Sequence, residues 1–329
     1  MIRPMQNTTL TALAWGIIAI FLAVDLVWLQ ASGLVFASST GPYLAMTGAV
    51  CAVLGVVPPA IRYRLRADNS LPARFIAEVA TRTLLLVYTA AFLVAIGIGG
   101  VIFSYLSTSL ALPFRDAELA AFDRTLGFDW PAFLAWTDRH WILAKTLTAA
   151  YHTTANQLVL LFIFLSFTRS VERLQEFLAI LALCSLATGI GMTLLPAEGA
   201  YAYYAPVVQN YASNAGMWHH ETVTALRTNA APVLDFAKMQ GLVTFPSFHT
   251  VLAIITTYAV RDWRWLLIPV TALNVVVVIA TITEGGHHLV DILAGALIAC
   301  SAIAFVRWLG SAYECGKTVA DTLSPPSLA

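Results

Sequence analysis

Three long apolar runs constrain this chain more than any other feature. They cover Leu84–Leu112, Leu174–Leu195 and Trp265–Thr283 and carry almost no charge. About 20 such residues are enough for a helix to cross a bilayer. No run of about 10 residues with alternating polarity, as in a transmembrane barrel, is visible. The sequence therefore predicts an all-α protein that crosses the membrane several times.

The composition agrees with this class. Of the 329 residues, 59% are hydrophobic and 11% are charged, whereas a soluble domain carries about 25% charged residues. The formal net charge is zero, so nothing argues for a nucleic-acid partner. The four cysteines are scattered, without the paired spacing of a zinc site, and we interpret them as small packing residues.

Hydropathy divides the chain into about eight predicted transmembrane helices and three regions. The spans are 10–31, 43–60, 83–108, 142–168, 174–195, 246–260, 265–283 and 287–309. Residues 1–75 form an N-terminal helix pair with a basic cytoplasmic loop. Residues 76–310 form the transmembrane core with outer loops at 113–141 and 196–243, and residues 311–329 form a C-terminal cytoplasmic tail.

The distribution of basic residues predicts the orientation. With the N-terminus inside, 12 of the 18 arginines and lysines fall on the inner side and 6 on the outer side. Positively charged short loops stay in the cytoplasm, so both termini are expected there. The two long loops then lie outside. We expect them to form a lid or substrate entrance, with Tyr201, Tyr203 and Tyr204 at the membrane interface; the alternative is that they are mere connectors.

Two short motifs place ionisable groups inside apolar segments. Thr244–Thr250 reads TFPSFHT, and Gly285–Gly295 reads GGHHLVDILAG. The 38 residues from His249 to His287 cover about 57 Å as helix, which is two crossings of a ~30 Å core. The hairpin therefore predicts that the two histidines lie at the same depth on the outer side.

The second motif contains a predicted histidine–carboxylate pair. His287 and Asp291 are four residues apart and share one face of a helix. The carboxylate can hold the proton of one ring nitrogen and leave the other nitrogen free to act as a nucleophile. His288 is rotated by about 100° and has no acid four residues later, so we rank it below His287.

The first motif resembles the start of a helix that binds phosphate. Pro246 suits a first helical turn, and the free N–H groups there, with the Ser247 hydroxyl, form an anion cradle. With His249 as proton donor, the set predicts phosphoryl transfer through a phosphohistidine. The alternatives are interfacial histidines, a zinc site, bis-histidine haem ligation or a proton relay.

Further polar residues could line the same pocket. In the fourth span Lys145, His152 and Asn156 lie in its outer half, and the last two share a face. The alternative is that they form hydrogen bonds between helices. Glu284 lies three residues before His287 and could tune it or bind a polar headgroup. Asp25 is isolated in the first span.

At these motifs the chain resembles the type-2 phosphatidic acid phosphatase superfamily. The family's P-S-x-H and H-x-x-x-D motifs read Pro246–His249 and His287–Asp291 here. The resemblance implies a six-helix core and metal-independent phosphoryl transfer without a cofactor. It also implies that His287 is the nucleophile, Asp291 its orienting partner and His249 the acid, while Ser247 helps hold phosphate.

The family's phosphate-binding arginines are absent. The K-x6-R-P motif is nearest to Lys145-x6-His152, and Ala280 and Thr281 stand where the family has Ser-Arg. Arg227, Lys238 or Arg124 could supply the missing charge; the alternative is that they are solvated loop residues. This version resembles the branch of the inositol phosphorylceramide synthases and their bacterial relatives.

We therefore expect an integral enzyme, in a bacterial inner membrane by this resemblance, with its site on the outer face. It would transfer a phospho-headgroup from a lipid phosphate ester to a lipid acceptor. The alternatives are a lipid phosphatase that uses water and, in another class, a membrane transporter. The expected partners are a lipid phosphate and membrane lipids, and the sequence leaves the oligomeric state open.

Overall fold

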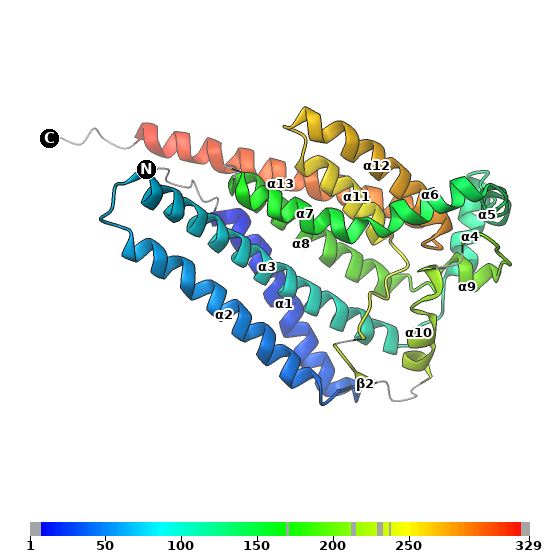
Figure 1. Ribbon diagram of the computed structural model, residues 1–329. Helices are drawn as coiled ribbons and strands as arrows, with labels where there is room; N and C mark the ends of the chain where they lie inside the picture. The colour runs from blue at the N-terminus through cyan, green and yellow to red at the C-terminus, as the bar shows by residue number, and fades with distance from the viewer. Residues whose placement is uncertain (1–7, 169–170, 212–214, 229–232, 237, 324–329) are drawn as a thin grey trace.

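The computed structural model describes residues 8–168, 171–211, 215–228, 233–236 and 238–323, with side chains described as far as Ser311. Within these ranges the protein is almost entirely helical and forms one bundle of long apolar helices (Figure 1). It is an all-α polytopic membrane protein.

Six helices are long and apolar enough to cross a bilayer. They are α1 (Thr8–Ser32), α2 (Thr40–Arg64), α3 (Leu71–Ser109), α8 (Val171–Leu194), α12 (Arg264–Thr283) and α13 (Leu289–Leu323), of which Leu289–Ser311 is the apolar part. The α3 helix starts at Leu71, before the predicted division between residues 1–75 and 76–310. The Ser70 side chain accepts the N–H of Ala73 and Pro72 occupies the first turn, and both features favour a helix start here.

The remaining two predicted spans differ from straight crossings. The fourth is a pair, α6 (Trp141–His152) and α7 (Thr154–Phe167), bent by 42°. The sixth is α11 (Phe248–Ala259), whose 12 residues cover about 18 Å and do not cross a ~30 Å core alone. The prediction of about eight spans thus becomes six long helices, one bent pair and one short helix.

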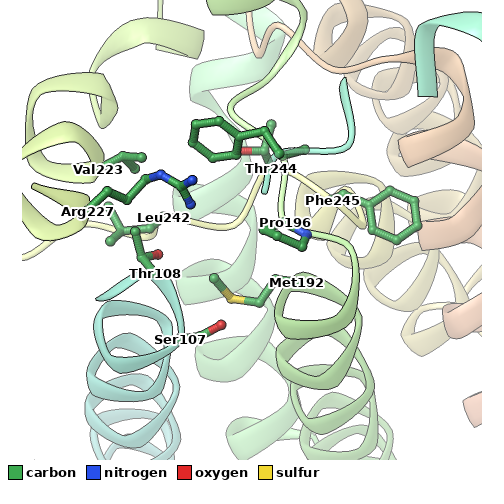
Figure 2. Close-up of a pocket in the computed structure, with 11 residues that line it drawn as sticks. Ser107, Thr108, Met192, Pro196, Val223, Arg227, Leu242, Thr244 and Phe245 are labelled. Carbon is green, nitrogen blue, oxygen red and sulfur yellow. The ribbon is translucent and has the colours of Figure 1, made fainter. Parts of the chain in front are cut away.

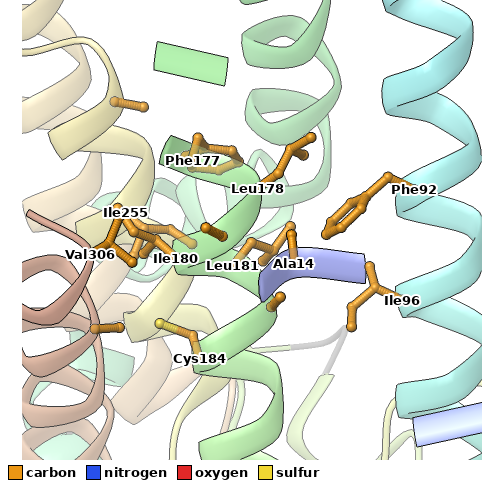
Figure 3. Close-up of a cluster of buried hydrophobic side chains, with 14 of the residues drawn as sticks. Ala14, Phe92, Ile96, Phe177, Leu178, Ile180, Leu181, Cys184, Ile255 and Val306 are labelled. Carbon is orange, nitrogen blue, oxygen red and sulfur yellow. The ribbon is translucent and has the colours of Figure 1, made fainter. Parts of the chain in front are cut away.

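The centre of the bundle is α8. It packs against α1, α3, α7, α11 and α13, and Figure 3 shows its side chains meeting those of the surrounding helices. Ala179, Ala182 and Cys184 on α8 are fully buried. Such small side chains allow helix backbones to approach closely, which is a main source of helix association in a bilayer.

The long connections gather at one end of the bundle, which we call the loop end (Figure 1). Its elements are α4 (Asp116–Thr125), α5 (Trp130–Arg139), α9 (Ala200–Tyr204), the 3-10 turn η1 (Ala215–Met217) and α10 (His220–Arg227). Two short strands, β1 (Val35–Phe36) and β2 (Val233–Leu234), pair in parallel and tie the first connection to the second long loop.

The opposite end carries a network of arginines. The Arg261 guanidinium donates to both carboxylate oxygens of Glu176, at 2.8 and 2.9 Å. Arg173 lies 2.6 Å from Glu176 and also pairs with Asp262. The arginines assigned to the inner loops around α8, α11 and α12 therefore meet at this basic end, away from both long loops.

The N-terminus of α11 packs tightly on α13 at Gly295. A Cβ atom at this position would lie 2.5 Å from the Ser247 carbonyl oxygen and 3.3 Å from the Thr250 side chain. The contact holds the first turn of α11 against the first turns of α13, so the two motifs share one packing interface.

We predict that Gly295→Ala destabilises the protein by about 1–3 kcal/mol, because the added methyl group pushes the start of α11 away from α13. The matched control is Gly310→Ala on the same helix, where an added Cβ meets nothing within 4 Å. Melting of both variants in detergent checks this. Equal melting temperatures for the two variants would contradict the close contact.

Candidate active site

The two sequence motifs meet at the loop end of the bundle. The backbone N–H of Ser247 donates to the carbonyl of Asp291 at 3.0 Å. Tyr151 stacks on His249, and a Cβ atom at Gly285 would lie 2.9 Å from the Tyr151 ring and 3.1 Å from the His287 ring, so Tyr151 lies near both histidines. The α11 helix is shorter than a full crossing, so the 38 residues from His249 to His287 do not form two full helical crossings as predicted. The two histidines nevertheless come together, because α11 starts inside the bundle beside the start of α13.

His287 and Asp291 form a buried pair. The His287 Nδ1 atom lies 3.3 Å from Asp291 Oδ2, and the His287 side chain is 4% exposed. The pair does not lie within one helix as expected, because α13 begins at Leu289 and Gly286 has a φ of +67°. Only the carboxylate stands in the first turn of α13. The contact through Nδ1 leaves Nε2 as the free ring nitrogen.

His249 lies in the first turn of α11 against Tyr151. The two rings stack with centroids 4.3 Å apart, and the Tyr151 hydroxyl lies 3.4 Å from His249 Nδ1. This contact fixes the plane of the imidazole. As in His287, the nitrogen that remains free is Nε2.

Ser247 is the N-cap of α11 and is fully buried. Its Oγ accepts the Thr250 N–H at 3.4 Å and the Thr250 hydroxyl at 3.2 Å. Capping uses the Ser247 oxygen as an acceptor, whereas phosphate would need the hydroxyl as a donor, so the phosphate contact of Ser247 stays a prediction. The first-turn N–H groups of a helix have no partner within the helix, so they form the anion cradle that α11 offers.

His288 has carboxylate partners that the sequence analysis did not assign to it. Its Nε2 lies 3.3 Å from Asp116 Oδ1 and its Nδ1 lies 3.7 Å from Asp123 Oδ2, both on α4. The ring is fully buried. Burial lowers the pKa of His288, but the nearby carboxylates of Asp116 and Asp123 outweigh it and raise the pKa to about 9. His288 therefore joins α4 to the bundle as a cation.

The same two aspartates also bind backbone. Asp116 accepts the N–H groups of Glu198 and Gly199, both at 2.9 Å. Asp123 accepts those of Leu289 and Val290 at 2.8 and 2.9 Å, which caps the start of α13. The α4 helix is thus fastened to the second loop and to α13.

Aromatic residues of the loops cover the turn that carries His287. The indole N–H of Trp130 lies 3.1 Å from the carbonyl oxygens of Ile282 and His287, and its ring stacks on Tyr204 at 5.4 Å. Tyr201 meets the same indole and is 2% exposed. The expected interfacial position of Tyr201 is therefore wrong; it packs beneath the loops.

Glu284 and His152 form a second histidine–carboxylate contact. His152 Nε2 lies 3.4 Å from Glu284 Oε1, and the Thr148 hydroxyl donates to Glu284 Oε2 at 2.8 Å. Glu284 is fully buried, whereas the His152 side chain is 37% exposed. Both candidates therefore belong to the same cluster as His249 and His287.

His219 is a site residue that the sequence analysis missed. Its Nε2 lies 3.4 Å from the Thr244 hydroxyl. Burial lowers the pKa of His219 to about 4, with a further contribution from the charge of His287, so the ring is neutral near pH 7. The signal in the sequence was the doublet of His219 and His220 in the second long loop.

The other candidates lie outside the pair of His287 and Asp291. Arg227 extends into a side pocket towards Thr244 (Figure 2) and stacks on Phe114. Lys145 is exposed and lies over the Trp141 ring. Asn156 and Lys238 are exposed. Within the described residues, none of the four contacts His249, His287 or Asp291.

No group of three or more histidine, cysteine, aspartate or glutamate side chains in the described part of the chain is arranged to hold a metal ion. The side chains that gather around His287 are suited to proton transfer and to nucleophilic attack on phosphorus.

Comparison with known proteins gives one match. The family model described as "PAP2 superfamily" matches residues 117–305, more than half of the chain. The matched region runs from α4 into α13 and contains both motifs, so the resemblance is confirmed at the level of the superfamily. No curated protein and no solved structure matches the chain.

We predict that His288→Gln destabilises the protein by about 3–5 kcal/mol, because it leaves two buried carboxylates without their cation. The matched control is His140→Gln, since His140 is exposed at the start of α6. Thermal melting in detergent near pH 7 measures both. An unchanged melting temperature for His288→Gln would contradict the role of this ion pair.

The stability should also depend on pH. Because folding raises the pKa of His288 from 6.5 to about 9, its contribution is fully present below about pH 6.5 and is lost as the pH rises through 9. Melting temperatures from pH 6.5 to 10 should fall for the native chain. The fall should be smaller in His288→Gln; identical profiles would count against the assignment.

Proposed function

The chain belongs to the PAP2 superfamily, and we propose that it transfers a phospho-headgroup between lipids through a phosphohistidine on His287. The observation that carries the proposal is the buried His287–Asp291 pair beside His249, at the meeting point of α11 and α13. A nucleophile with an orienting carboxylate and a nearby second imidazole is the arrangement that covalent phosphoryl transfer needs.

In the first step the Nε2 atom of His287 attacks phosphorus while Asp291 holds the proton on Nδ1. The bond from phosphorus to the leaving oxygen breaks, and His249 gives its proton to that oxygen. Asp291 is fully buried, and its Oδ1 has no hydrogen-bond partner among the described residues. The carboxylate can therefore stabilise the positive charge that develops on His287.

In the second step a hydroxyl group attacks the phosphohistidine. His249, left neutral by the first step, accepts the hydroxyl proton. The phosphorus–nitrogen bond breaks, and its electron pair returns to Nε2 of His287. His249 thus gives a proton in the first step and accepts one in the second, while His287 forms and then loses its bond to phosphorus. Microscopic reversibility requires this symmetry.

The charges around the site favour a phosphodiester as substrate. Within the described chain, no arginine or lysine hydrogen-bonds to, pairs with or stacks on His249, His287 or Asp291. Two buried carboxylates, Asp291 and Glu284, lie in the same cluster. A phosphomonoester carries nearly two negative charges at pH 7 and would be repelled, whereas a diester carries one.

A diester substrate fits headgroup transfer better than phosphate removal. We therefore propose the activity of the inositol phosphorylceramide synthase-like branch, with a lipid hydroxyl as acceptor. We also propose that the loop end faces the outer side of the plasma membrane. The gathering of Arg173 and Arg261 at the opposite end supports this orientation.

We predict that His287→Ala lowers turnover of a phosphodiester lipid by about 10³-fold or more, because the covalent intermediate can no longer form. Purified protein is supplied with a labelled diester lipid, with and without a lipid alcohol, and the products are identified. Trp141→Phe, an exposed change on α6, is the control. Retained turnover in His287→Ala would remove the nucleophile assignment, and labelled phosphomonoester as sole product would indicate water as acceptor.

A further inference from the structure

The pair of His152 and Glu284 lies beside the reacting histidines and has no part in the two steps above. The His152 ring meets Tyr151 edge-on at 5.4 Å, and Tyr151 stacks on His249. Glu284 precedes His287 by three residues. A single ring, that of Tyr151, therefore separates His152 from His249, the proposed proton donor to the leaving oxygen.

The structure holds this pair in a defined geometry. Glu284 is fully buried and accepts from Thr148 at 2.8 Å and from the N–H of Ala215 at 3.3 Å. Its contact with Nε2 of His152 at 3.4 Å leaves Nδ1 of His152 without a protein partner among the described residues. The His152 ring also stacks on Trp218 at 5.5 Å, with an interplanar angle of 22°.

The phosphate group of the substrate needs a hydrogen-bond donor beside the reacting histidines. A phosphodiester presents two nonbridging oxygens, which proteins usually bind with guanidinium or ammonium groups. Lys145 and Arg227 contact Trp141 and Phe114 instead. His152 is partly exposed, so a ligand can reach it, and its Nε2 atom faces the Glu284 carboxylate.

We propose that His152, held by Glu284, binds a nonbridging phosphate oxygen of the substrate through its Nδ1–H group. This inference rests on the proposed function and specifies its substrate as a singly charged phosphodiester. Because a carboxylate lies against its other ring nitrogen, His152 supplies a donor without the net positive charge that would compensate a phosphomonoester dianion.

The proposal predicts an effect on binding rather than on chemistry. His152→Ala should raise KM for a diester lipid by about 10–100-fold, the loss expected for one hydrogen bond to a charged group, and should leave kcat within a few-fold. His152→Arg should restore KM, because a guanidinium provides the same donor. The control is Thr146→Ala, an exposed position of the same helix.

The two outcomes that overturn the proposal are an unchanged KM in His152→Ala and a loss of kcat at constant KM, which would indicate that His152 only positions His249. Should His152→Ala fail to fold, His152→Met keeps much of the side-chain volume without a hydrogen-bond donor, and its KM tests the same contact.

A binding measurement separates this inference from the proposed reaction. A short-chain phosphodiester lipid is titrated into His287→Ala and into His287→Ala/His152→Ala, neither of which turns over if the proposed reaction is correct. The first variant should bind at least about 10-fold more tightly. Equal affinities would reject the phosphate contact even if headgroup transfer is confirmed. A difference would support it even if His287 is not the nucleophile.

Discussion

The ion pairs of His288 are the contact on which the loop end depends. A buried imidazolium lies between Asp116 and Asp123, and the same carboxylates accept four backbone N–H groups of the second long loop and of α13. An isolated charge in this apolar setting would be costly. Because the imidazolium faces both carboxylates and four N–H groups also bind them, the cluster instead fixes α4 over the start of α13, next to His287.

Hydropathy alone predicts the long helices well, because a stretch of apolar residues has few alternatives to a helix in a bilayer. It cannot predict where that helix breaks. The bend between α6 and α7 lies at Thr153, whose hydroxyl bonds to the Ala150 carbonyl at 2.6 Å, while Thr154 bonds to that of Tyr151 at 2.8 Å. Such side-chain bonds compete locally with helix geometry. The start of α11 likewise packs closely on Gly295 of α13, a contact that hydropathy does not show.

The site residues likewise divide into those that the sequence could predict and those that it could not. His249, His287 and Asp291 could be predicted because the motif spacing and the hairpin bring them to one end of the bundle. The partners of His288 could not, since Asp116 and Asp123 lie more than 160 residues away in sequence. His219 was hidden for the same reason: its place depends on the path of the second loop, which has no periodic pattern. Loop contacts of this kind decide which of two adjacent histidines is free to react.

The central claim is that His287 carries the phosphoryl group covalently. The most direct test is mass spectrometry of the purified protein, mixed with a phosphodiester lipid and quenched under alkaline conditions that preserve phosphohistidine. The account predicts an added mass equal to the phospho-headgroup, mapped to His287 and absent from Asp291→Ala, in which the imidazole is no longer oriented. A protein that turns over the lipid but shows no adduct, or shows it on His249 or His288, would contradict the account.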